Sequence, residues 1–248
     1  MKHKKIIDFL ESYYPLSKQM ENDISGFQFG NLQDKFLGCL VTTDVTLEAI
    51  DFCILKKLNL IVTHHPILYP NPVKAFENEF LQKKFLLLEK NQITVFSLHT
   101  NLDVLPNGLN YFLAKNFFTN QKVYLKETYA KINKKILPEK LLRKLKKTLK
   151  APIRYVFFED KILNIAFISG AGASLIPNIL KHDPKINTFI TGDVKLSDFI
   201  FAKDNKINLI DIGHEIEILL FKNLFFFLKK KFLKKKIYYL DSIEILTK

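Results

Sequence analysis

Two adjacent histidines, His64 and His65, end the apolar run NLIVT and are followed at once by Pro66. The chain contains six histidines in all, and imidazole is both a common ligand for divalent metal ions and a proton carrier near neutral pH. Pro66 restricts His65 to an extended conformation and removes a backbone donor, so a strand is predicted to end there. Successive side chains of a regular strand point to opposite faces. At a fraying strand end, we expect the two rings to serve two different ions.

Two other apolar runs also deliver ligand-type side chains where they end. ITVFSL is followed by HTNLD, which carries His99 and Asp103, and INLI is followed by DIGHEIE, which carries His214 and Glu217. His214 and Glu217 lie three residues apart at the predicted start of a helix, which puts both on one helix face. Because ligands of open α/β sheets bind at the carboxyl ends of the strands, these side chains are predicted to converge.

Five of these side chains form the predicted metal site: His64, His65, Asp103, His214 and Glu217. They are too few to fill two ions unless one carboxylate bridges and water completes the shells. A donor set of nitrogen and oxygen without cysteine fits Zn, Fe, Mn, Co or Ni, and a water shared by two such ions could act as a nucleophile. His99 is predicted to act as a general acid/base, while a role as a third imidazole ligand or as an orienting group stays open.

A glycine-rich segment, SGAGAS (169–174), follows another apolar run. Backbone N–H groups at a turn into a helix can hold a phosphate. Gly170, Gly172 and Ser174 are therefore predicted to bind an anionic substrate group, with Lys195 supplying a positive charge. The alternative interpretation is a tight turn with no ligand.

Apolar runs alternate with amphipathic segments along most of the chain. The predicted strands are 36–43, 58–63, 93–98, 153–158, 163–169, 186–191, 207–212 and 236–240. The predicted helices are 3–13, 46–57, 76–90, 107–117, 138–149, 174–181, 195–204 and 215–232. This rhythm is typical of α/β packing, with mostly parallel strands flanked by helices. Asp44 is predicted to cap the helix that follows it.

The polar, lysine-rich segment 119–137 has poor periodicity and separates two parts of similar content. The chain is therefore predicted to form two similar α/β halves, 1–125 and 126–248. We expect the metal site between these halves, at the carboxyl ends of the strands. No convincing sequence repeat relates the two halves.

Composition restricts the possible partners. The net charge of +13 suggests nucleic acid, but only Arg143 and Arg154 of the 38 basic residues are arginine, the side chain that reads bases and phosphates best. Compositional drift accounts for the excess of lysine, so nucleic-acid binding is the least favoured hypothesis. No apolar run approaches the roughly 20 residues of a membrane-spanning helix. We expect a cytoplasmic protein without a membrane partner.

Taken together and in order, these motifs resemble the Nif-three-like family, often labelled GTP cyclohydrolase 1 type 2 homologues. The matching segments are ISGFQFGN (24–31), VTTDVTLEAID (41–51), IVTHHPILY (61–69), SLHTNLDVLPNGLN (97–110), FISGAGASLI (167–176), TFITGDVKLSDFI (188–200) and IDIGHEIE (210–217). The resemblance implies a dinuclear metal site with the five ligands named above and His99 nearby. It also implies a ring-shaped homohexamer.

The chain departs from the family pattern at two points. Many members place the last glutamate four residues after the GH histidine, but residue 218 is isoleucine here, so Glu217 is taken as the ligand and Glu215 as the substitute. The segment ISGFQFGN (24–31) replaces the more usual DN-GL--G pattern. The 119–137 segment leaves no room for the inserted domain that some relatives carry.

Two functions are consistent with these residues. The first is a metal-dependent hydrolase that acts on a nucleotide-like or other small anionic substrate. The second is a metal-binding regulatory or metal-handling protein without a reaction of its own. Turnover against a panel of substrates separates them.

Overall fold

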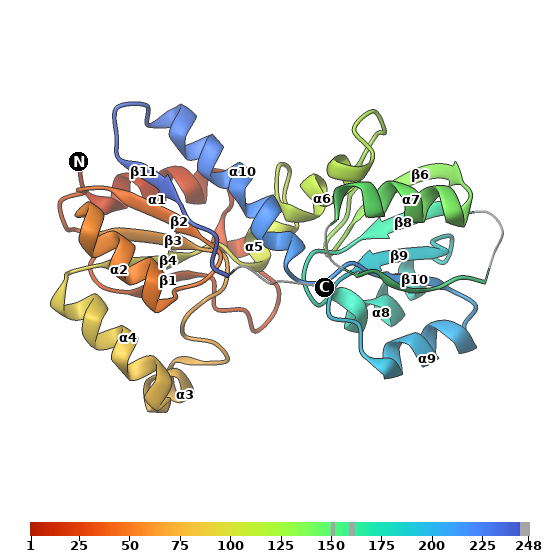
Figure 1. Cartoon of the computed structure of the whole chain (residues 1–248), viewed down its shortest axis with the longest axis horizontal. Coiled ribbons are helices and arrows are strands. Elements are labelled where there is room, and N and C mark those ends of the chain that lie inside the picture. The colour runs from red at the N-terminus through yellow and green to blue at the C-terminus, as the bar shows by residue number, and fades with distance from the viewer. Residues whose placement is uncertain (150–151, 159–161, 244–248) are drawn as a thin grey trace. The chain divides into compact units, whose positions relative to one another are not determined.

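The computed structural model describes residues 1–149, 152–158 and 162–243. These residues form two compact units, one made of residues 1–102 and 221–243 and the other of residues 103–220 (Figure 1). Each unit is a β-sheet with helices packed on it, which confirms the predicted α/β class. None of the described helices is both long and apolar enough to cross a membrane.

The first unit contains a five-stranded sheet in the order β1–β4–β3–β2–β11. Its strands are β1 (Gly26–Phe29), β2 (Cys39–Thr42), β3 (Leu60–Thr63), β4 (Thr94–Ser97) and β11 (Ile237–Tyr239). Strands β4, β3, β2 and β11 run parallel, and β1 pairs antiparallel with β4 at the edge. The loops that follow β2, β3 and β4 therefore leave the sheet at the same edge.

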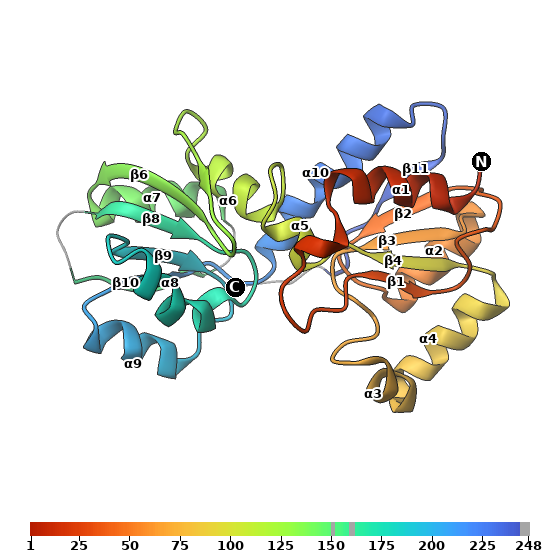
Figure 2. The ribbon, with the colours of Figure 1, turned by 180° about the vertical axis from the view of Figure 1, so that it is seen from behind.

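Helices cover both faces of the first sheet (Figures 1 and 2). The helices of this unit are α1 (His3–Tyr13), α2 (Leu47–Lys56), α3 (Pro72–Glu77), α4 (Glu79–Lys90), the short α5 (Thr100–Asp103), and α10 (Ile216–Lys231) from residue 221 onward; Leu16–Lys18 form a 3₁₀ turn. Helices α1 and α10 pack together through Phe9 and Phe227, whose ring centroids lie 5.2 Å apart. The other face packs on α2 and α4, where Cys53 is buried against Leu40 and Leu88.

The second unit contains a six-stranded sheet in the order β5–β6–β8–β9–β10–β7. Its strands are β5 (Tyr124–Leu125), β6 (Ala130–Ile136), β7 (Arg154–Val156), β8 (Ile162–Phe167), β9 (Thr188–Thr191) and β10 (Asn208–Asp211). The central strands β8, β9 and β10 are parallel, whereas β5, β6 and β7 pair antiparallel. Parallel strands thus form the centre of this sheet rather than its whole width.

Helices also cover the second sheet on both faces, with α6 and α7 on one and α8 and α9 on the other (Figure 1). Their bounds are α6 (Leu109–Phe117), α7 (Pro138–Thr148), α8 (Ile176–His182) and α9 (Leu196–Asp204), and Gly172–Leu175 form a 3₁₀ turn before α8. The core under α8 and α9 contains Ile176, Phe189 and Ala202, which are all buried.

The predicted strands and helices are confirmed, with three additional strands and one break. Strands β1, β5 and β6 were not predicted. Strand β6 lies inside the polar segment 119–137, where the buried Ala130 and Ile132 alternate with the half-buried Lys131 and the exposed Asn133, so the first half of the strand has one apolar face. The predicted helix 76–90 is two helices, because Asn78 is extended and its side chain accepts from Phe80 N at 2.9 Å.

The two units also differ from the predicted halves 1–125 and 126–248. Strand β11 pairs with β2 in the first sheet, so the end of the chain returns to the first unit. Residues 103–125 belong to the second unit instead. The predicted division assumed a single boundary in the chain, whereas the described residues pass from one unit to the other twice, after Leu102 and after Leu220.

Candidate metal centre

Three imidazoles come together in the first unit, at the ends of two neighbouring strands. His64 and His65 follow β3, and His99 follows β4. The ring centroid of His64 lies 4.8 Å from that of His65 and 5.1 Å from that of His99, and the latter two centroids are 5.9 Å apart. One potential ligand atom from each ring lies within 4.8 Å of the others. The exits of β3 and β4 therefore converge within this unit.

Each of these rings is held at Nδ1 by an oxygen atom. His64 Nδ1 lies 2.8 Å from Leu98 O, His65 Nδ1 lies 2.9 Å from Asp44 Oδ1, and His99 Nδ1 lies 2.7 Å from Asp23 Oδ1. A carbonyl oxygen can only accept, so Nδ1 of His64 must carry the proton. An ionised carboxylate imposes the same tautomer on His65 and His99. The lone pair of a neutral ring is then on Nε2 in all three.

The local environment keeps both aspartates ionised. Burial raises the pKa of Asp23, but hydrogen bonds from His99, Ser25 and Thr100 outweigh this effect and hold that pKa well below its usual range. Burial also opposes the ionisation of Asp44, yet the hydrogen bond and charge of His65 prevail and lower the pKa of Asp44 to about 2. At neutral pH both carboxylates are therefore acceptors for the imidazole N–H groups.

The second unit holds a histidine between two carboxylates. His214 Nδ1 lies 2.6 Å from Asp193 Oδ2, and His214 Nε2 lies 2.9 Å from Glu217 Oε2. The hydrogen bond to Glu217 is the largest cause of a raised pKa, and the charges of Glu217 and Asp193 add to it; burial opposes them, and the pKa of His214 reaches about 9. Glu217 is only 3% exposed although it is an acid in the first turn of α10. Divalent ions bind such a nitrogen and oxygen pair well.

The glycine-rich segment makes room for this carboxylate. Gly170 has a φ of +60°, and a Cβ at this position would lie 2.6 Å from Glu217 Oε1. Gly172 is buried, and its N–H is directed to Thr191 Oγ1 at 2.9 Å. The N–H of Gly172 is thus committed within the protein. Ser174 and Lys195 are exposed, so their predicted contact with an anionic substrate stays a prediction.

Two further residues, Asp103 and His182, end short helices. Asp103 ends the helical turn α5, which begins directly after His99. Asp103 is half-buried. His182 ends α8, is exposed, and has its Nδ1 2.9 Å from Asn178 O, which is an ordinary contact within a helix end.

Sequence reasoning did not find the three aspartates that hold the histidines. Asp44 was predicted to cap α2, but Thr46 is the N-cap and its side chain accepts from Ala49 N at 3.0 Å. Asp23 precedes β1 in a loop with no clear periodicity, and its role depends on a contact with His99, far away in the sequence. The only signal in the chain was that Asp44 and Asp193 also follow apolar runs.

A family model described as Duf34/NIF3 (NGG1p interacting factor 3) matches residues 1–244. This chain belongs to the NIF3 family. A relative from Mycoplasmopsis pulmonis, named GTP cyclohydrolase 1 type 2 homolog, is 37% identical over 91% of this chain and 92% of its own length. A relative of the same name from Methanocaldococcus jannaschii is 31% identical over 86% of this chain and 88% of its own.

The solved structures agree with this assignment. The structure titled reduced HcgD, from Methanocaldococcus jannaschii, superimposes with a TM-score of 0.83 at 27% identity and covers 97% of this chain and 98% of that one. The predicted family resemblance and fold class are confirmed by these matches. The metal site itself is not named in them.

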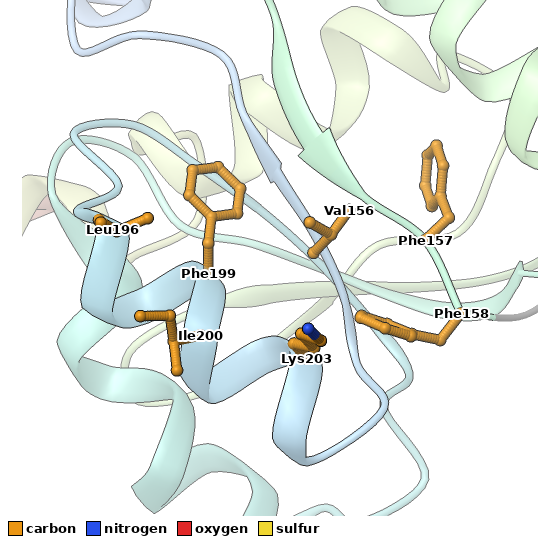
Figure 3. Close-up of a pocket in the computed structure, with 7 residues that line it drawn as sticks. All are labelled: Val156, Phe157, Phe158, Leu196, Phe199, Ile200 and Lys203. Atoms are coloured by element: carbon orange, nitrogen blue, oxygen red, sulfur yellow. The ribbon is translucent and has the colours of Figure 1, made fainter.

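A second feature of this NIF3-family chain is an open apolar hollow of about 470 Å³ in the second unit (Figure 3). Residues of α9 and of the segment from β7 onward line it: Val156, Phe157, Phe158, Leu196, Phe199, Ile200 and Lys203. Its lining contains no carboxylate, histidine or thiol. The histidines and carboxylates at the strand ends are therefore better candidates for catalytic groups than the residues that line this hollow.

Proposed function

We propose that this protein binds two divalent metal ions per chain and hydrolyses a small anionic, nucleotide-like substrate. The observation that carries the proposal is the group of His64, His65 and His99, in which an acceptor holds every Nδ1 and the ligand atoms lie within 4.8 Å of one another. Metal-binding histidines nearly always donate the other ring N–H to such an acceptor. The residues therefore fit a borderline divalent ion such as Zn, Fe, Mn, Co or Ni.

The proposed ligands are the five that the sequence singled out: His64, His65, Asp103, His214 and Glu217. Within the second unit, His214 Nε2 and Glu217 Oε2 are 2.9 Å apart and would offer one nitrogen and one oxygen donor. To bind a metal ion through these two atoms, His214 must lose the Nε2 proton that it shares with Glu217, and the ion would take the place of that proton.

Each remaining polar group has a proposed task. When bound, the ions would supply Lewis acidity and a nucleophile at neutral pH. His99, oriented by Asp23, would accept or donate a proton at Nε2. Lys195 and Ser174 would hold the anionic part of the substrate. The printed names of the relatives, GTP cyclohydrolase 1 type 2 homolog, support a purine nucleotide as the first substrate to try.

The experiment is elemental analysis of untagged protein after dialysis against each candidate metal. We expect close to two ions per chain, and stoichiometry well below one in every metal would reject the proposal. His65→Ala should lose metal, while His182→Ala should not, because the ring of His182 contacts its own helix end. Bound metal at a hundred times its Kd stabilises the native state by about 2.7 kcal/mol, so chelation should lower Tm.

A substrate panel containing GTP and other nucleotides then separates the two functions. Turnover that depends on added metal supports the hydrolase. Full metal occupancy without turnover favours a metal-handling or regulatory protein instead. Assembly into a homohexamer, which the family resemblance implied, is also proposed, and light scattering of the purified protein measures it.

A further inference from the structure

Two strand–helix–strand segments of the chain align without a gap. Residues 39–65 contain β2, α2 and β3, and residues 188–214 contain β9, α9 and β10. The identical pairs are Thr42/Thr191, Asp44/Asp193, Val45/Val194, Leu47/Leu196, Phe52/Phe201, Lys57/Lys206, Asn59/Asn208, Leu60/Leu209, Ile61/Ile210 and His65/His214. The expectation that no sequence repeat relates the two parts is thus wrong. The repeat is visible once the two Asp–His contacts are set side by side.

The aligned positions also share local structure. Lys57 and Lys206 end their helices with φ values of +53° and +54°. The next residue turns back onto the helix in the same way in each copy, with Leu58 N 2.8 Å from Cys53 O and Ile207 N 2.9 Å from Ala202 O. The alignment therefore describes a structural duplication and not a chance match of letters.

Another pair of equivalent residues fixes the start of the second strand in each copy. Asn59 Oδ1 accepts from Leu37 N, and Asn208 Oδ1 accepts from Phe158 N, at 2.9 Å in both cases. The donors are not equivalent in sequence. The asparagine acceptor is thus the same in both copies, whereas the segment that donates to it differs.

The last identical pair forms the same contact in both copies. Asp44 Oδ1 lies 2.9 Å from His65 Nδ1, and Asp193 Oδ2 lies 2.6 Å from His214 Nδ1, with a separation of 21 residues in each case. The exposed fractions agree as well: 44% and 30% for the first Asp–His pair, and 54% and 35% for the second. In each unit the aspartate leaves one parallel strand and the histidine leaves its neighbour.

The surroundings of the two aspartates are otherwise different. Asp44 N donates to Ser242 Oγ at 2.9 Å, and that serine comes from the segment after β11. Asp193 has a φ of +51° and follows Gly192. Because the loops differ while the contact to the histidine is kept, the contact is not a by-product of one loop conformation.

We propose that Asp44 and Asp193 are equivalent positioning residues that hold the proton of His65 and His214 on Nδ1 and so present Nε2 of each as a metal ligand. This inference rests on the proposed metal binding. Neutral imidazole has two tautomers, and a carboxylate acceptor at Nδ1 selects the one with its lone pair on Nε2. Carboxylates of this kind also orient the ring and make it a better donor.

The test uses Asp44→Asn and Asp193→Asn in the full-length protein. An asparagine amide can donate to Nδ1, which favours the opposite tautomer. We expect each variant to bind Zn²⁺ or Co²⁺ about 10- to 100-fold more weakly, the range found when such partners are removed. The matched controls are Asp51→Asn on α2 and Asp198→Asn on α9, acids of the same two segments that lie on helices rather than beside a site histidine.

A second measurement does not depend on metal. Ring ¹⁵N chemical shifts of the chelated, histidine-labelled protein identify the tautomer of His65, whereas Glu217 also accepts at Nε2 of His214 in the metal-free protein. We expect Nδ1–H for His65 in the wild type and a shift toward Nε2–H for His65 in Asp44→Asn, with no such shift in Asp193→Asn. A purely structural role would lower stability without this residue-specific change.

Several outcomes distinguish this inference from the function on which it rests. Wild-type protein that binds no metal rejects the function, while the ring shifts still decide whether Asp44 sets the tautomer of His65. Wild-type protein that binds metal, with variants that match it in affinity and ring shifts, rejects the positioning role alone. If an asparagine variant does not fold, an Nε2–H tautomer for His65 in the wild type also overturns the proposal.

Discussion

The two units share a strand–helix–strand segment and an Asp–His contact but differ in the donors around it. In the first unit the neighbouring groups are imidazoles, His64 and His99. In the second unit, Gly213 occupies the position equivalent to His64, and the neighbouring donor is the carboxylate of Glu217. The same strand–helix–strand segment is thus combined with imidazole groups in the first unit and with a carboxylate in the second.

This difference shows which parts of the chain carry the common geometry and which carry the distinct chemistry. The repeated segment supplies one oriented imidazole per unit and, in the first unit, also His64. The remaining donors come from outside it, from the exit of β4 in the first unit and from the first turn of α10 in the second. New donors can be added beside a packed segment without changing its core, because loops and helix ends tolerate substitution more readily than buried strands do.

The largest expected effect concerns His99, which lies outside the repeated segment. We expect His99→Gln to keep the metal and to reduce turnover about a hundred- to ten-thousand-fold, the usual contribution of a general acid/base. Asp23 holds His99 at Nδ1 and leaves the lone pair on Nε2, where a proton can be exchanged. Metal content and turnover are measured on the same preparation.

The same measurement tests the alternative role of His99. Metal and activity that fall together would make His99 a third imidazole ligand, and the first unit would then hold its ion with nitrogen donors alone. His182→Gln is the matched control, since its ring is exposed at the end of α8.

The next prediction exchanges residues between equivalent buried positions. Val62 in β3 is fully buried, whereas the equivalent Asp211 in β10 is buried and its Oδ2 accepts from Arg154 Nε at 3.0 Å. Val62→Asp would bury a carboxyl in the first sheet without an arginine partner, because the two arginines of the chain, Arg143 and Arg154, both belong to the second unit. We expect a loss of about 3–5 kcal/mol in the free energy of unfolding.

The reverse exchange should be much milder. Asp211→Val leaves Arg154, which is 60% exposed, in contact with water and with Val194 O. We expect a change within about 1–2 kcal/mol, since the exposed Arg154 guanidinium stays hydrated when the ion pair is lost. Urea unfolding of both variants in chelator gives the two values, and equal losses would show that the two sheets tolerate charge alike.

Much of the fold could be predicted from the sequence because buried parallel strands are short apolar runs. The strands β2, β3, β4, β9 and β10 are such runs, and the site histidines lie directly after three of them. Strand β6 was missed because its lysines mask the alternation of Ala130 and Ile132. The pairing of β11 with β2 depends on packing between distant parts of the chain, which local pattern does not contain.

The aspartates were missed for a similar reason. The contact of Asp23 with His99 joins residues 76 positions apart, and a single acid in a loop has many ordinary roles. Asp44 had a competing role as a helix cap, which Thr46 fills. Residue spacing within one segment predicted the metal ligands. The sequence repeat, in contrast, was recognised only after the Asp44–His65 and Asp193–His214 contacts had been compared.

The smallest expected effect tests the equivalence of the two repeats away from any ligand. Lys57 and Lys206 both adopt left-handed backbone where a helix ends, a conformation that favours glycine. We expect Lys57→Gly and Lys206→Gly each to raise the free energy of unfolding by about 0.5–1 kcal/mol, since relief of strain exceeds the added chain entropy of the unfolded state. Lys56→Gly and Lys203→Gly, which lie within helices α2 and α9, should instead destabilise by about 1 kcal/mol. Thermal unfolding of the four chelated variants measures this, and opposite signs at positions 57 and 206 would mean that the repeats end their helices for different reasons.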